Sequence, residues 1–177
     1  MPDGRTHDFI TFLLAPPAFA AAFAATGNVA NSFVVTAAFL FGGVMFGPDL
    51  DTVSRQYSRW GVFRWLWYPY RAFFSHRSRF SHGLLLGALI RVIYFMGAVS
   101  LVILSAAYIA AILRGGQPAG FTDISGIWAP VGNLMRESIG ENALLLIFNG
   151  LWAGAASHTF TDLAGTFIKT GRTGKFF

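Results

Sequence analysis

The sequence has no cysteine and few charged residues. None of its 177 residues is cysteine, which excludes disulfide bonds, thiolate metal ligands and cysteine nucleophiles. Asp, Glu, Lys and Arg make up 12% of the chain, whereas soluble domains carry about 25%. The content of 54% hydrophobic and 16% aromatic residues also excludes a disordered chain. The sequence contains neither a Walker-type phosphate loop nor a dinucleotide-binding fingerprint.

The hydrophobic residues fall into four stretches. These stretches predict transmembrane helices over about 9–25, 32–47, 83–113 and 142–163. The third is long enough to cross a bilayer. The apolar parts of the other three, about 9–25, 32–46 and 142–156, lie near or below the lower limit of about 17 residues. The chain length allows one domain. We therefore expect an all-α membrane protein, with a single membrane domain over residues 1–177 built as a bundle of about four transmembrane helices.

The first stretch has a second interpretation. Its alanine-rich end resembles the cleavage region of a secretory signal peptide. The preceding residues carry Asp3 and Asp8 against the single cation Arg5, which is a poor positively charged start for such a peptide. We therefore expect this stretch to remain in the protein as its first helix.

The positive charge of the chain is concentrated on one predicted side of the membrane. The formal net charge is +5. With four spans, both termini and the segment between the second and third helices share one side. That side holds Arg5, Arg55, Arg59, Arg64, Arg71, Arg77, Arg79, Lys169, Arg172 and Lys175, against Arg114 and Arg136 on the other. The positive-inside rule places both termini in the cytoplasm, and the basic excess predicts anionic lipid headgroups, not nucleic acid, as the partner.

The composition of residues 48–82 predicts a segment at the cytoplasmic interface of the membrane. Arginines alternate there with Trp and Tyr. Amphipathic rings and long basic side chains favour the headgroup level, so we expect a short interfacial helix over about 60–73. The loop on the opposite side, 115–132, is rich in Gly and Pro and is expected to be irregular, followed by an amphipathic turn over 134–139.

The scarce ionisable residues converge on one side of the predicted bundle. In an up-and-down bundle, the starts of helices one and three and the ends of helices two and four face the same side. All four histidines and most aspartates fall there, namely His7, Asp8, Asp49, Asp51, His76, His82, His158 and Asp162. His158 and Asp162 are four residues apart and share one face of a helix. Because helical bundles build metal sites from such ligands on separate helices, we predict a metal centre at this edge.

Simpler interpretations exist for each residue taken alone. A histidine at a helix end is often solvated or caps the helix, and Asp-x-Asp after a helix is common in turns. Asp49 and Asp51 either bridge two ions, or one is a ligand while the other orients a histidine. Arg91, within the third helix, either extends to the cytoplasmic interface or points into the site to hold an anion. The coincidence of several groups favours the metal centre.

Four motifs resemble those of a known family. They are Pro-Asp-Gly-Arg-Thr-His-Asp at the start, Gly-Pro-Asp-Leu-Asp, His-Arg-Ser-Arg-Phe-Ser-His-Gly and Ser-His-Thr-Phe-Thr-Asp. In order and spacing, over essentially the whole chain, the sequence resembles a family of uncharacterised metal-binding integral membrane proteins frequent in cyanobacteria. That family is distantly similar to predicted inner-membrane metal-dependent hydrolases. The resemblance implies a bacterial inner membrane or a thylakoid membrane as the location.

The resemblance also implies a set of metal ligands. Carried over motif by motif, these are His7, Asp49, Asp51, His76, His82, His158 and Asp162. In the related hydrolases a serine follows the second histidine of the third motif. Gly83 stands at that position here, which removes a possible hydroxyl contact. Mixed nitrogen and oxygen ligands suit one or two divalent ions, and they do not distinguish Zn²⁺, Mn²⁺ and Fe²⁺.

These features lead us to expect a metal-dependent hydrolase at the cytoplasmic membrane face, acting on phosphoesters of lipid headgroups. Asp8 or an aspartate that binds no ion is then expected to accept a proton, while Arg77 and Arg79 hold phosphate oxygens or only contact headgroups. The alternative is a structural metal site in an accessory or assembly subunit of a larger membrane complex. An ion transporter is disfavoured, because transporter sites lie near the bilayer midplane and these ligands gather at one edge.

Overall fold

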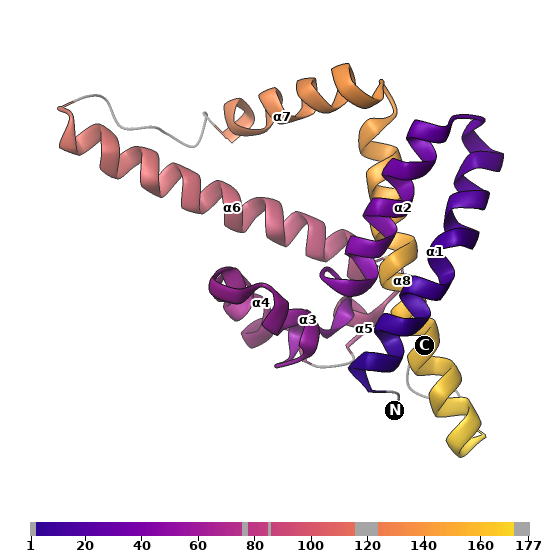
Figure 1. The fold of residues 1–177 in the computed structure, drawn as a ribbon. Coiled ribbons are helices and arrows are strands. Elements are labelled where there is room, and N and C mark those ends of the chain that lie inside the picture. Colours follow the sequence, from indigo (N-terminus) through magenta and orange to yellow (C-terminus); the bar gives the residue numbers. More distant parts are fainter. Residues whose placement is uncertain (1–2, 76–77, 85, 116–123, 172–177) are drawn as a thin grey trace. The chain divides into compact units, whose positions relative to one another are not determined.

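The computed structural model describes residues 3–75, 78–84, 86–115 and 124–171 (Figure 1). Every regular element among them is a helix, which confirms the expected all-α fold. The described residues group into two compact units, one formed by the chain up to Arg91 together with the chain from Leu145 onward, the other by Val92–Leu144. The residues of the candidate site all belong to the first unit.

Helices α1 (Gly4–Thr26) and α2 (Val29–Val44) form an antiparallel hairpin (Figure 1). Asp3 caps α1 by accepting a hydrogen bond from a backbone N–H of the first turn. Gly27 ends α1 in the left-handed conformation, with φ of 62°, which glycine adopts at little cost. Asn28 then caps α2. This tight turn places the start of α1 beside the end of α2.

Five short helices follow α2 in the described part of the chain. They are η1 (Pro48–Asp51), α3 (Arg55–Arg59), η2 (Gly61–Trp67), α4 (Tyr68–Phe73) and α5 (Arg79–His82). The expectation of one helix over 60–73 is therefore wrong in detail. Gly61 has a φ of 54°, outside the helical region, and Pro69 begins a new helix in the first turn of α4.

Part of the aromatic content of this segment is buried. Trp67 and Tyr70 are completely inaccessible to solvent. The Trp67 ring meets those of Phe46, Trp60 and Tyr70 edge to face, with centroids 5.2 to 5.7 Å apart. Phe73, by contrast, is 85% exposed. The segment therefore has its own small core, and only its outward-facing rings are available for the headgroup level.

Helix α8 (Ala143–Thr170) packs against α2 through glycines. A Cβ atom added at Gly154 would collide with the backbone carbonyl of Phe39, and one added at Gly42 with that of Leu151. The two backbones therefore touch, as small residues allow. The helix continues to Thr170 instead of ending near residue 163, so the predicted ligands it carries lie within the helix.

The second unit contains most of α6 (Leu86–Leu113) and all of α7 (Ile124–Ile139). The indole N–H of Trp128 in α7 donates a hydrogen bond to the Ser100 hydroxyl of α6, at 2.7 Å. This bond joins the two helices within the unit.

The prediction of an irregular loop over 115–132 is wrong for residues 124–132, which the structure describes as helical. That part belongs to α7, and the turn expected over 134–139 is the end of the same helix. Ile127, Val131 and Leu134 recur at the spacing of one helical face, so the apolar pattern overrides the local effect of glycine and proline. Residues 116–123 lie outside the described part of the chain.

Four helical segments are long and apolar enough to cross a membrane, judged by length and composition. They are Gly4–Thr26, Val29–Asp51, Leu86–Leu113 and Ala143–Thr170. Between 6% and 44% of the residues in their most apolar windows are buried within the protein. Most of this apolar surface is therefore exposed, which suits lipid and is unfavourable in water.

The glycine contact between α2 and α8 leads to the first prediction. Gly154→Ala places a methyl group against the Phe39 carbonyl, and overpacking of this kind costs about 1–3 kcal/mol. We expect a clear decrease in the thermal unfolding temperature of the detergent-solubilised protein. Gly97→Ala in α6 is the control, because a Cβ there meets nothing within 4 Å and should be neutral or stabilising. Equal melting temperatures for wild type and Gly154→Ala would contradict the contact.

Candidate metal centre

Six of the seven predicted ligands meet in one cluster. The first turn of α1 supplies His7, η1 supplies Asp49 and Asp51, the end of α5 supplies His82, and α8 supplies His158 and Asp162. The seventh, His76, lies outside the described residues. The convergence expected from the sequence is therefore present for every predicted ligand that the structure describes.

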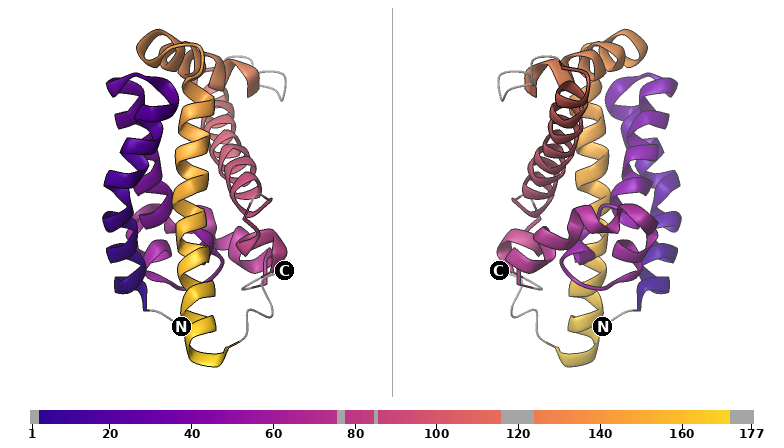
Figure 2. Two further views of the ribbon diagram at one scale, coloured as in Figure 1. Left: turned by 90° about the vertical axis from the view of Figure 1, so that its right-hand side faces the viewer. Right: turned by 90° about the vertical axis from the view of Figure 1, so that its left-hand side faces the viewer.

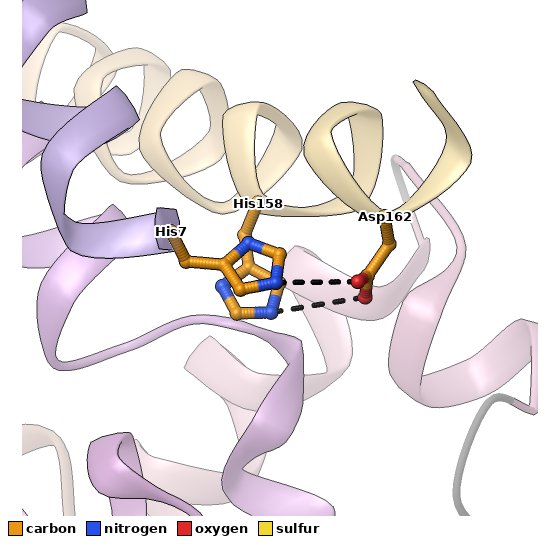
Figure 3. Close-up of side chains that lie close together, drawn as sticks. All are labelled: His7, His158 and Asp162. Atoms are coloured by element: carbon orange, nitrogen blue, oxygen red, sulfur yellow. Dashed lines mark ion pairs between the residues drawn. The ribbon is translucent and has the colours of Figure 1, made fainter. Parts of the chain in front are cut away.

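One group of ligands consists of His7, His158 and Asp162 (Figure 3). The two imidazole rings stack in parallel, with centroids 3.7 Å apart and planes 8° from parallel. His7 Nε2 lies 3.2 Å from Asp162 Oδ1, and His158 Nε2 lies 3.9 Å from Asp162 Oδ2. The stack thus directs both Nε2 atoms to the same carboxylate, and the three ligand atoms lie within 4.8 Å of one another.

A second group shares a ligand with the first. Asp49, His82 and Asp162 also offer ligand atoms within 4.8 Å of one another. Asp49 lies between two histidines, with Oδ1 3.6 Å from His82 Nε2 and Oδ2 3.3 Å from His158 Nε2. Asp162 therefore belongs to both groups, and the cluster has enough ligands for one ion or for two.

The residues fit a divalent ion. His7, His158 and Asp162 are at most 5% exposed. Among the described residues, His158 Nε2 and Asp162 Oδ1 have only the ion-pair contacts given above, and neither makes a hydrogen bond of regular geometry. Buried polar atoms that are incompletely hydrogen-bonded lower the stability of the fold. A cation between the two side chains would satisfy both, and imidazole with carboxylate is a donor set suited to Zn²⁺, Mn²⁺ or Fe²⁺.

The outer nitrogens of two histidines have partners of their own. His82 Nδ1 lies 3.1 Å from the Ser81 hydroxyl and 3.5 Å from Asp51 Oδ2. His158 Nδ1 lies 3.3 Å from Gln56 Nε2. Such contacts orient ligating imidazoles in metal sites. Of the two roles considered for Asp51, the geometry favours orienting His82 over binding an ion.

Gln56 is a member of the site that the sequence did not reveal. Its Nε2 donates to the Gly43 carbonyl at 2.6 Å and reaches His158, although the two residues are far apart in the chain. Its segment was expected to lie in the interface, and a single glutamine among arginines and aromatics carries no signal of metal chemistry. Only the tertiary contact identifies it.

The acidic neighbours of His82 affect its protonation. Burial lowers the pKa of His82, but its hydrogen bonds to Asp49 and Asp51 outweigh this effect and raise the pKa above the usual range. A metal ion that binds His82 must displace the proton that these carboxylates favour.

Arg91 points into the protein. It is 2% exposed, and its Nη1 donates to the Ser81 carbonyl at 2.6 Å. It also faces the hydroxyl of Tyr70, whose pKa is raised by burial and partly lowered again by this arginine. The side chain is therefore directed inward and not to the interface, and it braces the turn that carries His82; that it holds an anion stays a prediction.

The residues expected to act in catalysis lie differently. Asp8 is outside the ligand cluster, where it accepts hydrogen bonds from both terminal nitrogens of Arg59 and lies 3.4 Å from Arg55. Arg59 also donates to the Val44 carbonyl at 2.9 Å, so this ion pair ties α1 to the end of α2. Arg77 and the side chain of Arg79 lie outside what the structure describes. The catalytic roles of all three stay predictions.

The shared position of Asp162 gives the second prediction. Asp162→Asn removes a charged ligand from both groups, so we expect purified protein to lose most of its bound transition metal. Asp51→Asn should lower metal affinity by about 10- to 100-fold, as loss of an orienting partner does. Metal content is measured by mass spectrometry of the purified protein. Asp3→Asn is the control, since Asp3 is exposed and outside both ligand groups, and asparagine caps a helix as well as aspartate does. Unchanged metal content in Asp162→Asn would refute the site.

Comparison with known proteins supports metal binding. Residues 2–172 match the model of a family described as "Uncharacterized metal-binding protein (DUF2227)". No curated protein and no solved structure is significantly similar to the chain. The expected family character is thus confirmed for metal binding, while its frequency in cyanobacteria and its similarity to hydrolases stay predictions. Because the match spans nearly the whole sequence, the chain belongs to this family of uncharacterized metal-binding proteins.

Proposed function

We propose that the protein is a metal-dependent hydrolase of phosphoesters at a membrane surface. The observation that carries this proposal is the pair of ligand groups sharing Asp162, with Asp49 at their edge. The side chain of Asp49 is 22% exposed, whereas those of His82 and Asp162 are 2% and 1% exposed. A catalytic metal site keeps one position open, and a structural site is closed by protein ligands. The exposed side at Asp49 supports the catalytic interpretation.

The membrane location is part of the proposal. It is supported by four helical segments of suitable length and composition, whose apolar surface is mainly exposed. The excess of basic residues on the side of the ligands supports a cytoplasmic orientation of both termini and of the site. Anionic headgroups of the inner leaflet would then lie next to the cluster.

In this proposal, different side chains bind the ion and accept the proton. When bound, a divalent ion supplies Lewis-acid chemistry by polarising a phosphoryl oxygen and acidifying water. His7, His158 and Asp162 would hold it from two helices. The Asp49 carboxylate lies on the exposed side, where it can accept the proton of the attacking water. Asp8 is already paired with Arg59, so we assign this proton transfer to Asp49.

Hydrolysis provides the third prediction. Protein reconstituted in phosphatidylcholine vesicles and loaded with Mn²⁺ or Zn²⁺ should hydrolyse p-nitrophenyl phosphate or its diester. Asp49→Asn should lower kcat by about 100-fold or more, in the range of a lost general base. It should keep metal bound by His7, His158 and Asp162. His158→Ala should lose both metal and activity, and Asp3→Asn should lose neither. Metal-loaded wild type without activity on either ester would refute the hydrolase.

A second candidate function is a structural metal clamp in a subunit of a larger membrane complex. The burial of His7, His82 and His158, each at most 5% exposed, favours it. A buried ion held by α1, α5 and α8 would tie these elements together.

The two functions differ in their response to a chelator, which is the fourth prediction. For the hydrolase, we expect chelation to abolish hydrolysis and to lower the melting temperature only as loss of a bound ligand does, about 3 kcal/mol at a metal concentration of 100 times Kd. For the clamp, chelation should unfold the protein, and a partner should co-purify in fixed stoichiometry without any hydrolysis. Circular dichroism and size-exclusion chromatography distinguish the two outcomes.

A further inference from the structure

A groove runs between α1 and α8 within the first unit. Its volume is about 760 Å³, within the range of ligand pockets of 300–1,000 Å³. Helices α1 and α8 lie side by side in the left view of Figure 2, with α2 behind them, and Phe39 of α2 is among the groove residues. The predicted metal ligands are not among the residues that line it. The groove is therefore a separate feature beside the metal centre.

The groove is almost wholly apolar. Its hydroxyl groups come from Thr6, Ser157 and Thr161, each the sequence neighbour of a ligand in the first group, so this part of the groove lies level with the metal centre. These hydroxyls already donate hydrogen bonds, that of Thr6 to Asp3 and the other two to carbonyls of α8. Residues such as Leu14, Trp152 and Ile168 form the remaining walls. The groove itself therefore suits an apolar chain, and only the charges around its end at Thr6 and Ile168 can place a headgroup.

The length of the groove suits one lipid leaflet. On α1 it extends from Thr6 to Ala18, which corresponds to about 18 Å of helix. The hydrocarbon core of a bilayer is about 30 Å thick, so one leaflet contributes about 15 Å. A single acyl chain lying along α1 therefore finds apolar walls over its whole depth in the leaflet.

Exposed basic residues lie around the end of the groove that Thr6 and Ile168 form. Arg5 and Lys169 are exposed and lie one residue beyond the groove residues Thr6 and Ile168. Arg55 is half exposed and packs its side chain against Gly4. The acids near this end are Asp3, which caps α1, and Asp8, which is paired with Arg59 and Arg55. The exposed basic residues outnumber these two acids. The buried carboxylates of the metal centre are balanced by Arg91 once a divalent cation is bound, so this end then favours an anionic headgroup.

We propose that this groove holds one acyl chain of an anionic glycerophospholipid, so that the phosphate of its headgroup lies level with the metal centre. The binding of the acyl chain is inferred from the groove alone. Only the role of this lipid as substrate rests on the proposed hydrolase function. The apolar walls would fix the depth of the lipid, and Arg5, Arg55 and Lys169 would favour its charge.

Photo-labelling tests the groove directly. The protein is reconstituted in phosphatidylcholine vesicles that contain a small fraction of phosphatidylglycerol with a diazirine at the end of one acyl chain. After irradiation, mass spectrometry should find the label at Leu14, Pro17 and Trp152. It should be scarce at Phe12 and Leu13, which are exposed but lie outside the groove. The same diazirine on phosphatidylcholine should label the groove several-fold less.

A matched pair of variants provides the control. Ala18→Phe fills the groove and should reduce labelling by about ten-fold, whereas Ala20→Phe, on an exposed face of the same helix outside the groove, should leave it unchanged. Unchanged metal content shows that both variants are folded. Label spread equally over the exposed faces of α1, unchanged labelling in Ala18→Phe, or a cross-link from the groove to another protein helix would each overturn the proposal.

The same variants separate this inference from the proposed function. Hydrolysis of p-nitrophenyl phosphate needs the metal centre without the groove, so Ala18→Phe should retain it and lose hydrolysis of phosphatidic acid. If the wild-type protein is labelled in the groove but hydrolyses neither p-nitrophenyl phosphate nor phosphatidic acid, the proposed hydrolase function is refuted and the proposed lipid site is supported. If both esters are hydrolysed and the groove is not labelled, the lipid site fails and the hydrolase stands.

Discussion

The balance of buried charge at the site is the constraint on which the rest of the structure depends. Asp49, Asp51 and Asp162 bring three carboxylates together, and Arg91 is the buried guanidinium that faces them among the described residues. With neutral histidines this set carries a net charge of −2, and burying uncompensated charge costs several kcal/mol per ion. One divalent cation removes the imbalance. Two cations would leave a charge of +2, and in the proposed function a doubly charged phosphate group would neutralise it.

The geometry of the ligands depends on close helix contacts around them. The backbone contact at Gly154 holds α8 against α2 immediately before His158. Gly43 of α2 meets the Thr11 side chain on one side and accepts the Gln56 amide through its carbonyl. The same amide reaches His158. A shift of α8 would therefore move His158 and Asp162 together relative to His7, and a displacement of about 1 Å is enough to spoil a catalytic arrangement. The small residues of these helices set the position of the ligands without touching an ion.

The sequence was sufficient to predict which residues gather, because alternating helix directions bring distant segments to one end of a bundle. His7, Asp49, His82, His158 and Asp162 were all found in this way. It was not sufficient to predict where helices end. Helix α8 continues past residue 163 through Gly165 and ends only before Gly171, which has a φ of 66°, and α7 begins before residue 132 because its apolar face outweighs Pro130. Gln56 and the burial of Trp67 could not be predicted, since both depend on contacts between segments distant in the chain.

The depth of the cluster bears on the choice between surface chemistry and transport. His7 lies in the first turn of α1, and Asp49 lies after the end of α2, so neither is near the middle of its segment. Asp162 lies about 12 Å from the end of α8, given the helical rise. A transport site requires ligands that both sides of the membrane can reach in turn, usually at interrupted helices near the midplane. Here the ligands of α1, η1 and α5 stand at helix ends next to basic residues, while α8 continues for about 18 Å beyond His158. The proposed reaction on a headgroup would use this arrangement, because the scissile phosphate and the metal centre would then lie at one depth while the acyl chain remained in the bilayer.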